Sequence, residues 1–532
     1  MGTLFALFLS TLFVSSSYSN ADHEFVYCLS QRSPPLEPMS GIIFTETNAS
    51  YTSLLESSAQ NLRFSTSRTP KPEFIITPLI DSHVQATVMC CRKHGLQIRM
   101  RSGGHDYEGL SYTSEVPFIL LDLVNMRSIH VDLKDNSMWV EAGATIGEVY
   151  YRIAEKSPIH GFPGGNFPTV GVGGLFSGGG FGTMLRKYGL SADNIVDALM
   201  VDVNGRILDR ESMGEDLFWA IRGGGGASFG IILSWKIILV KVPPVVTVFQ
   251  IPKTVGQGAT NLVYKWQNIG QSLDENLFIR VKIHVVSTET ERTIQATFKS
   301  LFLGRADQLL AILDDTFPEL GVEKEDCAEM SWIESVLYFS GYPEGETKEV
   351  LLNPKPPKRG YFKATALEEL WKWSLQEEKA TLLLDPFGGR MSQISESDLP
   401  FPHRKGNLYA IMYFVEWEEE DTGGSERHME WMRRVYKHMA SYVSQNPRAA
   451  YVNYRDLDLG QNELADTTYK QATVWGSKYF KDNFRRLAIV KSFVDPTNFF
   501  AFEQSIPPLI LREGKLKTEN NKKLFSVFSI PN

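Results

Sequence analysis

Runs of apolar residues along the chain predict a fold that mixes strands and helices. Short apolar runs bounded by turn-forming residues predict strands at 74–78, 98–101, 118–123, 129–132, 138–143 and 230–242. Apolar residues at helical spacing predict helices over 81–95 and 146–156. Asn204-Gly205 is a two-residue turn signal that joins 193–203 and 207–208 as a hairpin. We therefore expect an α+β fold built on short sheets.

Longer alternating strands are predicted in the second half of the chain. Residues 277–285 alternate, so Arg280, Lys282 and His284 share one face, which is either an ordinary solvated surface or the polar wall of a cavity. Further segments are assigned by the same reasoning: a strand at 408–417, helices at 425–445 and 475–484, and a strand or turn at 451–456. Pro243-Pro244 marks the boundary between the two halves.

Two glycine-rich segments interrupt the pattern. In Arg101-Ser102-Gly103-Gly104-His105, two adjacent glycines allow backbone N–H groups to approach a phosphate-bearing ligand closely, although an ordinary turn with a surface histidine fits as well. Residues 161–182 combine many glycines with apolar residues, among them Phe167, which we expect to be buried. A glycine-rich backbone tied down in this way suits a large flat or charged ligand. Neither segment has the Rossmann or Walker pattern.

Composition narrows the classes of partner and the compartment. The chain has 532 residues, a formal charge of −8 and no basic cluster, which argues against binding to nucleic acid or anionic membranes. Residues 1–21 have the pattern of a secretory signal peptide, and no later run reaches the roughly 18 apolar residues of a membrane span. Cys28 could pair with Cys90 or Cys91 in an oxidising compartment. Asn48 begins a glycosylation sequon, so we expect a glycoprotein that is secreted or delivered to the vacuole.

Taken together, the glycine segments resemble the plant berberine-bridge-enzyme-like flavoproteins, which have the vanillyl-alcohol-oxidase type of FAD fold. The resemblance covers nearly the whole mature chain and is closest to the cannabinoid-acid synthases and the mulberry-type flavoproteins, which include Diels–Alderases. The matching blocks are Arg-Ser-Gly-Gly-His-Asp at 101–106, and residues 140–144, 168–174, 213–226, 453–460 and 495–500.

The resemblance implies how the chain is divided. An N-terminal arm (22–69) precedes an FAD-binding domain of the PCMH/VAO type (70–244), which the C-terminal segment (476–532) completes. Between them, residues 245–475 form a substrate-binding domain with an antiparallel sheet covered by helices. The resemblance also pairs Cys28 with Cys90 and leaves Cys91 and Cys327 free. We expect a monomer without a metal site.

The resemblance also implies roles for single residues. His105 matches the histidine that bonds covalently to the flavin, and Tyr469 matches the tyrosine base of the cannabinoid branch. Phe167 stands where the family usually has a second flavin-bonding cysteine, so at most one covalent link forms. Leu175 and Ala410 replace a histidine and a glutamate. The residues expected to contact FAD are Arg101, Ser102, Gly103, Gly104, His105, Gly171, Gly173, Gly174, Ser177, Gly178, Gly182, Ile231, Asn453 and Asn498.

Three functions remain open at this stage. The first is oxidation or oxidative cyclisation of a (prenylated) phenolic substrate, with Tyr469 as proton acceptor and oxygen reoxidising the flavin. The second is a Diels–Alder reaction between a phenolic diene and a chalcone-type dienophile, with Arg280 or Arg455 polarising a carbonyl. The third is a flavin-binding protein without catalysis. We place oxidation first, because His105 and Tyr469 are retained.

Overall fold

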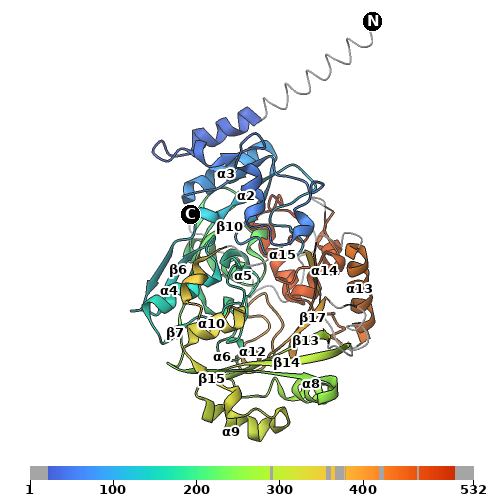
Figure 1. The fold of residues 1–532 in the computed structure, drawn as a ribbon. Coiled ribbons are helices and arrows are strands. Elements are labelled where there is room, and N and C mark those ends of the chain that lie inside the picture. The colour runs from blue at the N-terminus through green and yellow to red at the C-terminus, as the bar shows by residue number, and fades with distance from the viewer. Residues whose placement is uncertain are drawn as a thin grey trace, which may run out of the picture.

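The computed structural model of the chain describes residues 22–287, 292–354, 361–365, 377, 379–418, 424–441, 443–463 and 467–509 (Figure 1). The predicted signal peptide and the end of the C-terminal segment lie outside the described residues. Helices and strands alternate along the chain, as expected for an α+β fold.

Two sheets form the first half of the molecule. In the smaller one, of order β1-β2-β4-β3, β4 pairs in parallel with both β2 and β3. In the larger one, of order β5-β6-β10-β8-β9, every pairing is antiparallel. The strands are β1 (Ile43–Phe44), β2 (Phe74–Ile76), β3 (Gln97–Arg101), β4 (Phe118–Asp122), β5 (Ile129–Asp132), β6 (Ser137–Glu141), β8 (Ile195–Val201), β9 (Ile207–Leu208) and β10 (Ile231–Ile238). β7 (His160–Gly161) pairs separately with β11 (Val240–Lys241).

The helices of this half follow local sequence signals. α3 (Asp81–His94) ends at Gly95, whose left-handed φ of 71° suits glycine, and contacts β3 of one sheet and β8 of the other. α4 (Ile146–Lys156) begins with a capping box between Thr145 and Glu148. The remaining helices are α2 (Tyr51–Ser57), α5 (Val172–Ser177), α6 (Leu185–Tyr188) and α7 (Arg210–Ile221).

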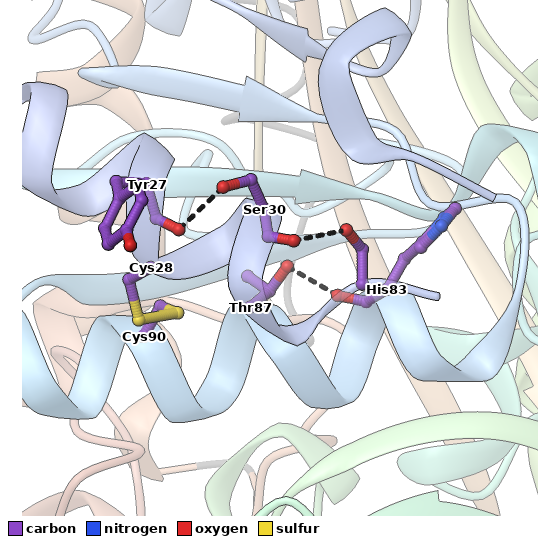
Figure 2. Close-up of a disulfide and its surroundings, with 7 residues drawn as sticks. Tyr27, Cys28, Ser30, His83, Thr87 and Cys90 are labelled. Carbon is purple, nitrogen blue, oxygen red and sulfur yellow. Dashed lines mark hydrogen bonds between the residues drawn. A yellow bond between two sulfur atoms is a disulfide. The ribbon is translucent and has the colours of Figure 1, made fainter. Parts of the chain in front are cut away.

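A disulfide fixes the N-terminal arm to this half. Residues 22–32 are helical, and Cys28 in this segment is bonded to Cys90 in α3 (Figure 2). Cys91 and Cys327 are free, so the pairing implied by the family resemblance is confirmed. Asn48, the predicted glycosylation site, is exposed.

A seven-stranded antiparallel sheet forms the second half, in the order β15-β12-β14-β13-β17-β18-β16. Its strands are β12 (Val246–Thr254), β13 (Leu277–Ser287), β14 (Arg292–Phe302), β15 (Ala328–Met330), β16 (Tyr361–Thr365), β17 (Ala380–Pro386) and β18 (Tyr409–Trp417). The helices are α8 (Ala259–Ile269), α9 (Ala306–Thr316), α10 (Trp332–Ser340), α12 (Arg390–Gln393) and α13 (Gly424–His438). Residues of α8, α9 and α13 form one core with the apolar face of the sheet (Figure 1).

The opposite face of this sheet carries the alternating polar residues and lies toward the first half. A small apolar cluster, which includes Phe181, Phe278 and Phe401, fills the seam between the halves. The C-terminal helices α14 (Tyr469–Phe480) and α15 (Asn483–Val494) belong to the core of the first half. The expected domain boundary at 475/476 therefore falls inside α14.

Two local predictions were wrong, and one open alternative is decided. The helix expected over 475–484 is two helices, because Lys481 adopts a positive φ of 46° and ends α14. Residues 161–182 hold a short helix, α5, and the side chain of Phe167 is 58% exposed rather than buried. Of the two assignments offered for 451–456, the turn is correct.

Candidate functional site

The loop at 101–105 leaves the end of β3 and is anchored beneath by Arg101. This guanidinium is fully buried, pairs with Asp122 at 2.6 Å and donates hydrogen bonds to the carbonyls of Leu54 and Leu55. Its side chain is thereby committed to the protein interior. Arg101 holds the base of the loop and leaves only its backbone for the predicted cofactor contact.

The two glycine-rich segments touch each other through their backbones. A Cβ atom on Gly103 would lie 2.3 Å from the backbone nitrogen of Gly171, and one on Gly171 would lie 2.0 Å from Ser102 Oγ. Ser102 Oγ donates a hydrogen bond to the carbonyl of Ala142 at 2.6 Å. Gly104 adopts a φ of +68°. Glycine at these positions is what allows the two loops to pack against each other.

His105 is held by the second segment. Its Nε2 lies 2.9 Å from Thr169 Oγ1, whereas in the described part of the chain no protein group hydrogen-bonds to Nδ1. Burial lowers the pKa of His105 from 6.5 to about 4, although the contact with Thr169 acts in the opposite direction. The imidazole is therefore neutral at physiological pH, with one nitrogen held and the other open.

The remaining glycines of 161–182 meet the C-terminal part of the chain. Gly173 lies within α5, and Ser177 ends this helix and donates a hydrogen bond from its Oγ to the carbonyl of Gly173. Gly174 faces open space. Gly178 lies against Asn453, whose amide donates to the carbonyl of Leu175 at 2.9 Å. Gly182 approaches the carbonyl of Gly164. Asn453 thus links residues 451–456 to the glycine-rich segment 161–182, and its contact with FAD stays a prediction.

Two further expected residues lie in the core of the first half. Ile231 begins β10 and is fully buried. Asn498 has a positive φ of 55°, and its Oδ1 is buried without a hydrogen-bond partner among the described residues. A buried amide oxygen without a partner is costly unless a further group binds it, so Asn498 Oδ1 is suited to accept a hydrogen bond from a ligand.

A polar, aromatic wall faces the His105 loop across the seam. Tyr107, two residues after His105, contacts Met412 of β18 through its hydroxyl and packs edge-on against Tyr454 at 5.9 Å. Burial raises the pKa of both tyrosines, and the proximity of the two rings raises that of Tyr454 further. Both hydroxyls are therefore protonated and able to donate hydrogen bonds at physiological pH.

Arg280 of β13 completes this wall. Its guanidinium forms a bidentate pair with Asp385 of β17 at 2.6 and 2.8 Å. Burial lowers the pKa of Arg280, but Asp385 more than offsets this effect, so the net shift is upward. Asp385 lies directly opposite Ala410 in the sheet, so its carboxylate shares the face on which the resemblance implies a glutamate in other members of the family. Because that carboxylate is bound to Arg280, it is not free to act as a proton acceptor.

The other two expected catalytic residues lie elsewhere. Arg455 pairs with Asp106 at 3.5 Å and donates to the carbonyl of Gln504, a structural role that leaves little reach toward a substrate. Tyr469 is the first residue of α14, and its ring stacks on Phe484 of α15 at 5.3 Å. Among the described residues, no contact joins Tyr469 to Tyr107, Tyr454 or Arg280. Its role as a base stays a prediction that this position does not favour.

Sequence reasoning missed most of the wall. Tyr107 lies two residues after His105, and Tyr454 directly follows Asn453. Their places beside two expected site residues could have indicated them. Asp385 had no such signal, since it ends an ordinary apolar strand. In the described part of the chain, no cluster of His, Cys, Asp or Glu could hold a metal ion, and no helix is long and apolar enough to cross a membrane.

Comparison with known proteins agrees with this architecture. Residues 72–210 match the family model of an FAD-binding domain, and residues 450–507 match the berberine and berberine-like model. Tetrahydroberberine oxidase of Berberis wilsoniae is 52% identical over 526 residues, covering 95% of this chain and 97% of that protein. This chain belongs to the berberine-bridge-enzyme-like family of FAD-linked oxidoreductases.

Two further relatives support the assignment. A monolignol oxidoreductase of Arabidopsis thaliana, AtBBE-like 13, is 50% identical and covers 94% of this chain and 96% of its own length. The solved structure of BBE-like #28 from the same plant has a TM-score of 0.85 and 46% identity, over 92% of this chain and all of that one. The chain is therefore an enzyme of this FAD-dependent family.

The residues present fit FAD as the cofactor. The packed glycine loops allow close backbone approach, His105 offers an open Nδ1, and Asn498 offers an unpartnered buried oxygen. These groups come from the first half of the chain and from its C-terminal segment, which share one core.

Proposed function

We propose that the enzyme oxidises a phenolic plant metabolite, with molecular oxygen as electron acceptor. The observation that carries this proposal is the wall of Tyr107, Tyr454 and Arg280, which begins two residues from His105. Aromatic rings and neutral hydroxyls suit an aromatic ring that bears oxygen substituents. The relatives named as oxidases and as a monolignol oxidoreductase support a redox reaction on a small molecule.

The chain's own residues would bind and orient this substrate. Tyr107 and Tyr454 would pack against the ring and donate hydrogen bonds to its oxygens, while Asp385 fixes the guanidinium of Arg280 at the edge of the wall. The chemistry that bound FAD supplies is acceptance of a hydride from the substrate and transfer of the electrons to an acceptor. Tyr469 is the proton acceptor suggested by the family resemblance, and the variant Tyr469→Phe tests it.

We also propose that FAD is attached through His105 alone. The neutral imidazole with an open Nδ1 supports this link, and Phe167 offers no thiol for a second one. After denaturation in acid, flavin fluorescence should remain with the polypeptide of the wild type. The His105→Ala variant should release all of its flavin; retained flavin in that variant would show that another residue forms the bond.

A second function is favoured by a specific observation. At physiological pH, Tyr107, Tyr454 and Arg280 are all hydrogen-bond donors, and Asp385, the carboxylate opposite Ala410, is occupied by Arg280. Donors of this kind would polarise a carbonyl dienophile and lower the barrier of a Diels–Alder reaction without net electron transfer. A phenolic diene and a chalcone-type dienophile are the substrates of this alternative.

One experiment separates the two reactions. The purified holoenzyme is mixed without oxygen with a panel of prenylated and unprenylated phenols, and separately with a chalcone and a diene, while the flavin absorbance is followed. Loss of the oxidised flavin band, followed by peroxide formation when air is admitted, supports the oxidase. Product formed while the flavin stays oxidised supports the Diels–Alderase and overturns the oxidase. Flavin binding with neither outcome over the whole panel would indicate a silent flavoprotein.

We further propose that the protein enters the secretory pathway. The apolar N-terminal segment, the Cys28–Cys90 disulfide and the exposed Asn48 support this route. N-terminal sequencing of the plant-expressed protein should begin near residue 22, and removal of N-glycans should lower its mass. An N-terminus at Met1 would contradict the proposal.

A further inference from the structure

One ring nitrogen of His105 is held by the protein and the other is accessible. Nε2 lies 2.9 Å from Thr169 Oγ1, and in the described part of the chain no protein group hydrogen-bonds to Nδ1. The side chain keeps some exposure, and Nδ1 does not belong to the buried polar atoms that lack a partner. His94, His284 and His403 do each have such a closed-in ring nitrogen. His105 differs from these three because its second nitrogen faces space that a ligand can reach.

The position of Thr169 is fixed on both sides by the first turn of α4. The carbonyl of Pro168 accepts a hydrogen bond from the backbone N–H of Gly147 at 2.8 Å. The carbonyl of Val170 accepts one from the N–H of Ile146 at 2.9 Å. The N–H groups of a first helical turn have no partner within the helix, so α4 uses two of them to hold this segment. The side chain of Thr169 is 5% exposed, and His105 is the partner of its hydroxyl.

A hydroxyl at Nε2 decides what Nδ1 can do. The imidazole of His105 is neutral at physiological pH, because burial lowers its pKa to about 4 against the smaller, opposite effect of Thr169. A neutral imidazole carries one hydrogen on either of its nitrogens, and the other nitrogen has the lone pair. The hydrogen bond made by one nitrogen selects between the two forms. When a hydroxyl accepts the hydrogen of Nε2, the lone pair is on Nδ1, the accessible nitrogen.

We propose that Thr169 is a positioning residue for the covalent attachment of FAD, because its hydroxyl accepts the hydrogen of Nε2 and leaves the lone pair of Nδ1 available to the flavin ring. This inference rests on the proposed attachment through His105. It goes beyond that proposal by naming the group that makes His105 reactive. In the described part of the chain, no other side chain hydrogen-bonds to this imidazole.

The hydroxyl of Thr169 suits both ends of the reaction. Attachment forms a bond between Nδ1 and a methyl carbon of the flavin ring, while one methyl C–H bond breaks and Nε2 gives up its hydrogen. The two electrons pass into the flavin and then to oxygen, the acceptor of the proposed reaction, which leaves with both hydrogens as hydrogen peroxide. The neutral product has its lone pair on Nε2, and the same hydroxyl can turn and donate to it. Valine has nearly the same shape and can do neither.

The test compares Thr169→Val, which lacks the hydroxyl, with Thr169→Ser, which keeps it. Each full-length protein is purified at set times after induction, and we measure the share of its bound flavin that stays with the polypeptide after denaturation in acid. This share should rise about tenfold more slowly in Thr169→Val, which is the lower end of the effect of losing the outer partner of a metal-binding histidine. Thr169→Ser should stay within about twofold of the wild-type rate, since a hydroxyl remains at Nε2. Total bound flavin should be the same in all three proteins.

Thr87→Val is the matched control. Thr87 is fully buried in α3, and its hydroxyl donates to the carbonyl of His83 at 2.8 Å. The variant therefore loses a buried hydroxyl in the same half of the molecule, away from the two glycine-rich segments. It should lower the melting temperature and leave the rate of attachment unchanged. If Thr169→Val binds no flavin, Thr169→Ala serves as the second variant, with the same expected slowing.

Three results would overturn the role of Thr169. They are attachment at the wild-type rate in Thr169→Val, slowing of the same size in Thr169→Ser, and slowing of the same size in Thr87→Val. Release of all flavin from the wild type would overturn the attachment through His105 and this inference together. A wild type that retains its flavin, with Thr169→Val attaching flavin equally fast, would refute this inference alone. Oxidation of the substrate is tested separately, by loss of the oxidised flavin band.

Discussion

The Asp385→Asn variant tests whether Asp385 is the group that compensates the buried charge of Arg280. The two side chains are 4% and 14% exposed, and two hydrogen bonds of 2.6 and 2.8 Å join them. Removing one partner of a buried pair costs about 3–5 kcal/mol, because the other charge is left without compensation. Since Asn166 still contacts Arg280, we expect the lower end, about 3 kcal/mol of unfolding free energy.

Urea unfolding followed by tryptophan fluorescence measures this loss. A double variant, Arg280→Met with Asp385→Leu, should recover most of the stability, because it removes both charges from the buried site. The matched control is Asp458→Asn, which breaks a bidentate pair of the same geometry with Arg433 at the surface and should cost less than about 1 kcal/mol. A loss below about 1 kcal/mol in Asp385→Asn, or a double variant as unstable as the single one, would refute the reasoning.

Three further outcomes follow from particular contacts. Burial, followed by the charge of Lys481, lowers the pKa of His403 from 6.5 to about 4, so the unfolded state binds more protons than the folded state between these pH values. The unfolding free energy should therefore fall by about 2 kcal/mol from pH 7 to pH 5 through this residue. The His403→Gln variant should remove that part of the pH dependence of the unfolding free energy. Gly103→Ala places a Cβ 2.3 Å from a backbone nitrogen and should reduce flavin content and melting temperature together, whereas Gly41→Ala, where nothing lies within 4 Å, should change neither. Cys28→Ser opens a link between residues 62 apart and should cost about 4 kcal/mol by the loop-entropy relation, while Cys327→Ser should have no effect in the same urea titration.

Local sequence signals were sufficient for much of the fold. The helices α3 and α4 and the hairpin of β8 and β9 formed where apolar spacing, caps and Asn204-Gly205 predicted them. The errors arose where backbone geometry overrides spacing. The apolar pattern of 475–484 continues through Lys481, yet the positive φ of that residue ends one helix and starts another.

The site was less predictable, because its members are far apart in sequence. The pair Arg280–Asp385 spans 105 residues, and the contact between Tyr107 and Met412 spans 305. A single sequence identifies Arg280 on a polar face but contains nothing that selects Asp385 as its partner. The same limit applies to Arg455, which resembles a substrate-polarising residue in sequence and is an ion-pair partner of Asp106 in the structure.

The family resemblance implies departures at three positions, and the structure shows that the fold depends little on them. Phe167 is exposed, and Leu175 and Ala410 are only partly buried, so none of them belongs to the fully buried core. The exchanges that the family resemblance implies at these positions would therefore create no cavity in either large core. The match to BBE-like #28 at a TM-score of 0.85 therefore describes the fold and does not by itself define the reaction. It follows that the reaction must be argued from particular side chains, among them Tyr107, Tyr454 and Arg280, and not from the overall resemblance.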